Sequence, residues 1–142
     1  MILLDVNTVM ALFVERHPHH RAARNWYEQT RVDREEYGAP PTVWHSFVRL
    51  ATNRSATGAV ISLQEAFAFM ADMRSAAGYR DIHPGKGHLR LFRQTCEQAS
   101  ARGNLVPDAA LAAIAIENGA TLASFDRDFA RFPGLRWIVP GE

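Results

Sequence analysis

The hydrophobic positions along this chain follow two patterns, one typical of strands and one typical of helices. Short, mostly apolar runs, typical of strands covered on both faces, occupy residues 1–5, 37–40, 120–125 and 135–139. The more polar stretch 79–84 is a further predicted strand. Between them, apolar residues recur at helical spacing and predict helices that begin near residues 9, 17, 41, 62, 89 and 107. Strands that alternate with helices favour a parallel sheet between helical layers, so the pattern predicts the α/β class.

The chain length fits a single domain spanning residues 1–142. A domain of this size buries roughly two thirds of its unfolded surface and needs no disulfide to be stable. The one cysteine, Cys96, excludes an internal disulfide and fits a reducing compartment. We find neither a basic leader nor an apolar run long enough to cross a bilayer. We therefore expect a cytoplasmic protein that has no contact with the membrane.

The charge balance gives no global indication of a nucleic-acid partner, because the net charge is only +1. All basic residues except Lys86 are arginines. Arginine suits bidentate phosphate contacts, but GC-rich codon usage explains the same bias, and the arginines are scattered. The candidate phosphate contacts are Arg49, Arg54 and Arg127, since these arginines lie closest in sequence to the candidate site elements described next. For each of them, a solvated or ion-paired surface residue is the simpler explanation.

Carboxylates stand at the ends of apolar elements. Asp5 ends the first strand, Asp126 ends the fourth with Asp128 two residues on, and Asp108 lies in the first turn of an apolar helix. The turn after Asp5 contains Asn7 and should lie at the carboxyl edge of the sheet, where open α/β folds bind ligands. Buried carboxylates need hydrogen-bond donors or cations. The pattern indicates a divalent metal site, although Asp108 could simply complement its helix dipole.

Three histidines, His17, His19 and His20, surround a proline before the second helix. Such a cluster raises the possibility of zinc. However, adjacent histidines on a helix point to different faces, and no cysteine or His-x-x-x-His pair completes a tetrahedral set. We expect a solvated helix end that begins at the proline.

Three stretches of the sequence carry a family resemblance, and they are residues 3–7, residues 103–112, and residues 124–129 together with 132–137. They resemble PIN-domain proteins, and more narrowly the VapC toxins of bacterial toxin–antitoxin pairs. Family members are single domains of this length, so the resemblance covers the whole chain. It implies a three-layer α/β/α sandwich with a mostly parallel sheet of about four to five strands.

The resemblance also implies that the protein is an endoribonuclease that depends on Mg²⁺ or Mn²⁺ and cleaves tRNA, rRNA or mRNA. VapC proteins form homodimers and are silenced by a VapB antitoxin. Carried over by motif, Asp5, Asp108 and Asp126 are the catalytic, metal-binding acids, and Asp128 is an accessory metal ligand. Asn7 corresponds to a polar residue that orients a carboxylate or a water on the metal.

One position departs from the family pattern. Many members carry a glutamate where this chain has Ser46, and no acid lies between Glu36 and Glu65. The absence of this glutamate leaves open the alternative that the chain is a catalytically silent binding module, which only pairs with a partner. A haloacid-dehalogenase-like phosphatase is a more distant alternative. It would need an aspartate where Asn7 stands and a motif lysine that Lys86 does not match.

Overall fold

Four parallel strands form the central sheet of the computed structural model, which describes residues 1–142. Their order is β2-β1-β3-β4, and Leu3 of β1 pairs with Gly38 of β2 on one side and Leu122 of β3 on the other. The strands are β1 (Ile2–Leu4), β2 (Tyr37–Gly38), β3 (Thr121–Ala123) and β4 (Trp137–Ile138). The predicted α/β class is confirmed, and each of these strands is shorter than its apolar run.

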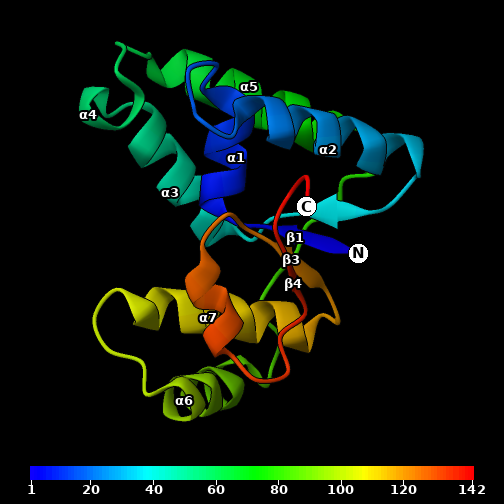
Figure 1. Ribbon diagram of the computed structural model, residues 1–142, viewed down its shortest axis with the longest axis vertical. Helices are drawn as coiled ribbons and strands as arrows, with labels where there is room; N and C mark the ends of the chain where they lie inside the picture. Colours follow the sequence, from blue (N-terminus) through cyan, green and yellow to red (C-terminus); the bar gives the residue numbers. More distant parts are fainter.

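Helices cover both faces of the sheet, with α1, α2, α3 and α5 on one side and α6 and α7 on the other (Figure 1). This is the three-layer arrangement expected from the sequence. The helices are α1 (Val6–Phe13), α2 (His20–Val32), α3 (Pro41–Ala51), α4 (Arg54–Thr57), α5 (Leu63–Ser75), α6 (His88–Ala99) and α7 (Leu105–Glu117), followed by the 3₁₀ helix η1 (Arg127–Arg131). None of them combines the length and the apolar content that crossing a bilayer requires.

Local capping explains where several helices begin. The Ser62 hydroxyl accepts from the Glu65 N–H at 3.1 Å, and the Glu65 carboxylate accepts from the Ser62 N–H at 2.8 Å. This reciprocal pair is the predicted capping box of α5. Pro41 is the first residue of α3, as expected. The short helix α4 was not predicted; the Asn53 side chain caps it by accepting from the Ser55 N–H at 2.9 Å.

The prediction of a strand at residues 79–84 is wrong. Only Tyr79 forms a bridge to the sheet, opposite Tyr37 at the free edge of β2. The Arg80 N–H still donates to the Tyr37 carbonyl at 2.8 Å. The two chains come so close that a Cβ at Gly38 would collide with the Arg80 carbonyl. No further ladder bond forms beyond this point, and Pro84 has no N–H to extend one.

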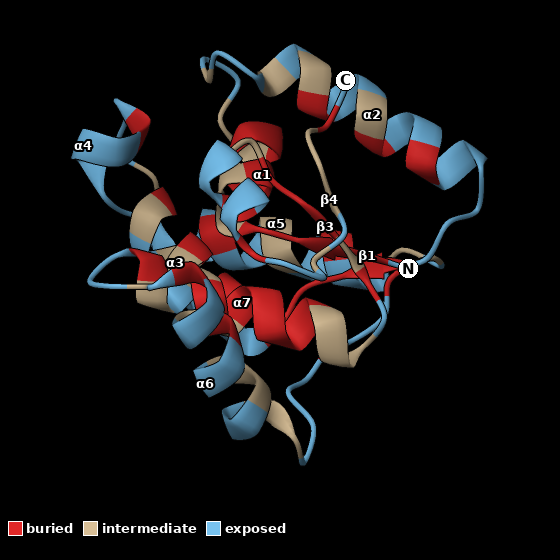
Figure 2. Cartoon of the chain, turned by 60° about the horizontal axis from the view of Figure 1, so that its bottom comes forward, coloured by how far each residue is buried: buried red, intermediate tan, exposed pale blue.

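The core lies on both sides of β1 and β3 and includes most of α7. Buried residues (red in Figure 2) dominate α1, α7 and the strands β1, β2 and β3, whereas α5 and α6 present mostly exposed faces. In α7, seven of the thirteen residues are buried. Asp108 is half-buried near the start of this apolar helix. The core therefore holds the beginning of α7 firmly against the carboxyl edge of the sheet.

Candidate active site

Asp5 connects the end of β1 to the start of α1. Its Oδ1 accepts from the Val6 N–H at 2.6 Å and caps the helix, and its side chain is only 7% exposed. Burial raises the pKa of this carboxyl, while hydrogen bonds from Ser124 and Val6 oppose the rise. Only neutral groups donate hydrogen bonds to this deeply buried carboxylate. They therefore compensate only part of the free-energy cost of removing its charge from water.

Ser124 joins the ends of β1 and β3 and was not recognised from the sequence. Its fully buried hydroxyl donates to Asp5 Oδ2 at 2.7 Å, and it accepts from Asn7 Nδ2 at 2.9 Å and from the Asp126 N–H at 3.0 Å. The Phe125 N–H donates to Asn7 Oδ1 at 3.1 Å, which fixes the orientation of that amide. Asn7 thus orients Asp5 through Ser124 rather than by a direct bond.

Asp126 stands at the start of η1, three residues beyond the end of β3. Its Oδ1 accepts from the Asp128 N–H at 2.9 Å, so this carboxylate caps the 3₁₀ helix. Asp126 is half-buried and Asp128 is exposed. Of the four acids proposed from the sequence, Asp128 is therefore the one most open to solvent.

Asp108 lies close enough to the other three acids for their charges to act on it. Burial, followed by the negative charges of Asp5, Asp126 and Asp128, raises its pKa to about 6. The acids come from three separate places in the sequence, and the folded chain brings their charges together. The structure thus places all four predicted acids at one edge of the sheet.

No cation balances this cluster within the chain. The five ion pairs of the protein involve none of these four acids. No group of three or more His, Cys, Asp and Glu side chains is arranged as a ready set of metal ligands. An all-oxygen donor set fits a hard divalent ion such as Mg²⁺, which binds carboxylate oxygens and keeps several waters.

Comparison with known proteins identifies the family. The model of the PIN domain matches residues 2–135. The chain belongs to the PIN-domain family. Ribonuclease VapC31 of Mycobacterium tuberculosis is 41% identical to it over 140 residues, which cover 99% of both chains. The family assignment removes the haloacid-dehalogenase alternative.

Solved structures agree with this PIN fold. VapBC2 from Rickettsia felis, bound to a DNA fragment from its promoter, superimposes with a TM-score of 0.71 at 18% identity and covers 98% of both chains. VapC20 of Mycobacterium tuberculosis, described as a toxin that cleaves the sarcin-ricin loop, gives a TM-score of 0.67 at 20% identity and covers 96% of this chain and 99% of that one. At such identities the likeness establishes the fold.

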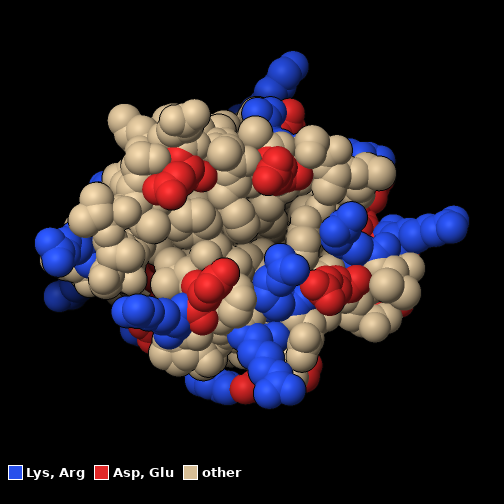
Figure 3. Space-filling view, turned by 90° about the horizontal axis from the view of Figure 1, so that it is seen from above, with Lys and Arg blue, Asp and Glu red and all other residues tan.

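The three arginines proposed as phosphate contacts are exposed, and their surroundings differ. Arg127 follows Asp126 directly, but its guanidinium pairs with Glu142 at 2.6 Å. Arg49 lies in the last turn of α3 and Arg54 begins α4, and neither forms an ion pair. Over the face shown in Figure 3, basic side chains form separate groups interspersed with acids, which agrees with the scattered distribution in the sequence.

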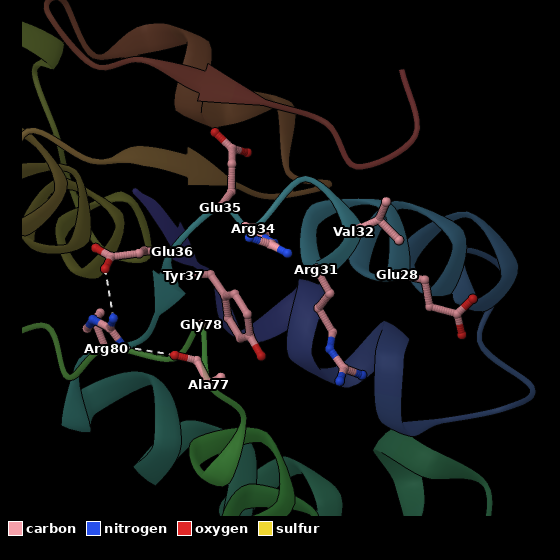
Figure 4. A pocket seen from close by; sticks show the side chains of 10 residues that line it. All are labelled: Glu28, Arg31, Val32, Arg34, Glu35, Glu36, Tyr37, Ala77, Gly78 and Arg80. Carbon is pink, nitrogen blue, oxygen red and sulfur yellow. Dashed lines mark hydrogen bonds and ion pairs between the residues drawn. The ribbon is translucent and has the colours of Figure 1, made fainter.

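A charged hollow of about 660 Å³ lies away from the acids, where α2 ends and β2 begins. Figure 4 shows Arg31, Arg34 and Arg80 around it together with three glutamates. Arg80 pairs with Glu36 at 2.9 Å. Because β2 starts here, the hollow is at the amino edge of the parallel sheet, opposite Asp5, and contains none of the predicted site residues.

Proposed function

We propose that this PIN domain is a Mg²⁺- or Mn²⁺-dependent endoribonuclease and the toxin of a VapBC toxin–antitoxin pair. The observation that carries the proposal is the cluster of four acids at the carboxyl edge, with no intramolecular cation to balance it. Its 41% identity with a protein named as a ribonuclease supports the reaction class.

Asp5, Asp108 and Asp126 would hold the ion, with Asp128 as an outer ligand. Bound Mg²⁺ or Mn²⁺ supplies charge neutralisation at the phosphate and lowers the pKa of water. Ser124 and Asn7 keep the Asp5 carboxylate in one orientation through the 2.7 and 2.9 Å hydrogen bonds. Because the pKa of Asp108 is raised to about 6, the group is partly protonated near and below that pH, and ion binding there should release a proton.

The partners are part of the same proposal. Structural relatives include VapBC complexes from Rickettsia felis and Salmonella typhimurium. We therefore expect a VapB-type antitoxin to inhibit this protein, a homodimer as the toxin assembly, and an RNA substrate. VapC20, which resembles this chain in fold, is described as cleaving the sarcin-ricin loop, and that makes a structured RNA loop a reasonable first substrate to test.

The test is cleavage of total RNA by purified, antitoxin-free protein in Mg²⁺ or Mn²⁺, with a chelated control and with the cut ends mapped by sequencing. We expect discrete cuts that require metal. Asp5→Asn and Asp108→Asn should each reduce the rate by at least about 100-fold, because loss of a direct ligand should cost no less than loss of a supporting residue.

Asp72→Asn is the matched control, since Asp72 is an exposed acid on α5 outside the cluster. It should cleave as the unmodified chain does. Folded, metal-loaded protein that makes no cuts would favour the catalytically silent binding module, in which the Ser46 replacement has removed activity. Cuts that persist in Asp5→Asn would place the reaction elsewhere.

A further inference from the structure

Two aromatic rings from distant segments stack beside the acid cluster. The rings of His19 and Phe125 are 4.3 Å apart between centroids, with 4° between their planes. Phe125 stands between Ser124 and Asp126 in the sequence, and its N–H donates to Asn7 Oδ1 at 3.1 Å. The stack is therefore attached directly to the residues that hold the site together.

The loop that carries His19 is fixed by its own contacts. The His19 N–H donates to Nδ1 of His17 at 3.0 Å, and Nδ1 of His20 lies 2.7 Å from the Ala11 carbonyl oxygen. Phe125 packs against the core, whereas the His19 side chain is exposed. The helix end expected from the sequence to be merely solvated instead presents an ordered aromatic surface, and α2 begins only at His20.

The charge of the site explains why such a surface would be useful. Four acids repel RNA phosphates, and the nearest arginine in sequence, Arg127, is already paired with Glu142. An unpaired RNA strand therefore needs attraction that does not depend on phosphate charge. Protein aromatic rings, histidine included, stack on unpaired bases. Consecutive Cα atoms are about 3.8 Å apart, so Phe125 is within about one nucleotide of a phosphate at Asp126.

We propose that the His19–Phe125 stack is a platform for an unpaired RNA base next to the phosphate held at the acid cluster. This inference rests on the proposed ribonuclease function and adds a determinant of substrate choice to it. Because the platform is already ordered, base binding would require little further ordering of the protein. Stacking would also persist at salt concentrations that screen phosphate contacts.

The test is binding of a short, fluorescently labelled, single-stranded RNA to the full chain in EDTA, where metal-dependent cleavage cannot occur. We expect His19→Ala to raise Kd by about 5- to 150-fold, the range that corresponds to the loss of one base–aromatic stack. His19→Phe should restore most of the affinity. An RNA that lacks the stacked base should bind His19→Ala and the unmodified chain equally well.

His83→Ala is the matched control, because His83 is exposed and its carbonyl contacts Asn118, at the far end of α7 from Asp108. Thermal unfolding should show that His19→Ala remains folded. An unchanged Kd for His19→Ala, a failure of His19→Phe to rescue, or no RNA binding by the unmodified chain would each overturn the platform. Cleavage in Mg²⁺ separately tests the ribonuclease, so the two proposals can fail independently.

Discussion

At the scale of single residues, the site is defined by acids that are held in place without positive partners. Asp5 is fixed by Val6 and Ser124, and Asp126 by the N–H of Asp128. These bonds orient the carboxylates but bring no positive charge to them. The protein therefore retains electrostatic repulsion at its own site, and its stability should depend on pH and on cations.

Asp108→Asn should stabilise the metal-free protein at neutral pH. The pKa of Asp108 is raised from 3.8 to about 6, so the folded state binds this proton more tightly than the unfolded chain does. Its contribution to the free energy of unfolding therefore falls as pH rises through this window, and the deficit persists above it. We expect a gain of about 1 kcal/mol at neutral pH, allowing for screening of a half-buried group.

Urea unfolding in EDTA at about pH 4 and at neutral pH checks this sign. Near pH 4 the carboxyl is protonated in the folded state and partly protonated in the unfolded state, so the difference between variant and parent should be much smaller than at neutral pH. Asp72→Asn should show no comparable gain at either pH. A destabilised Asp108→Asn protein at neutral pH would mean that the charged form has a favourable partner.

At the scale of elements, the site is built from residues at the ends of strands and helices rather than from residues along their faces. Asp5 joins β1 to α1, Asp126 follows β3 and caps η1, and Asp108 lies in the first turn of α7. Ends of elements leave backbone donors free, and side chains at those positions can serve both as caps and as ligands. The cap of α5, by contrast, involves none of the four acids.

Ser62→Ala should destabilise the fold by about 1 kcal/mol, because it removes the acceptor for the Glu65 N–H at the start of α5. Ser62→Asp keeps an acceptor there and should recover most of the loss. Urea unfolding measures both variants. RNA cleavage at a temperature where all three proteins are folded should be unchanged, and a selective loss of cleavage would show that the start of α5 contributes to the reaction.

At the scale of the whole molecule, a cation should link the separate parts of the sheet edge. An ion that binds only the folded state at 100 times its Kd adds about 2.7 kcal/mol. For a chain of this length we expect Mg²⁺ or Mn²⁺ to raise Tm by roughly 5–10 °C. Thermal unfolding with and without the metal measures the shift.

The paired variant Asp5→Asn, Asp108→Asn should lose most of this metal-dependent shift while remaining folded. Asp72→Asn should keep it. An equal rise in Tm for all of these proteins would indicate a general salt effect rather than a site at the acid cluster.

The sequence by itself determined the class of the fold and the kinds of side chain at its edge. Period and composition predicted alternating strands and helices, and local signals predicted the α5 cap and the start of α3 at Pro41. The motifs identified the family that comparison then established. These features were predictable because each depends on residues close together in the chain.

Only the tertiary structure decided which distant residues meet. The Ser124 hydroxyl reaches Asp5 across 119 positions, and the His19 ring reaches Phe125 from another loop. It also decided that Tyr79 bridges the sheet without starting a strand and that Arg127 pairs with Glu142. Strand order and loop packing create these contacts, and no local periodicity encodes them, because parallel strands are paired through long crossovers.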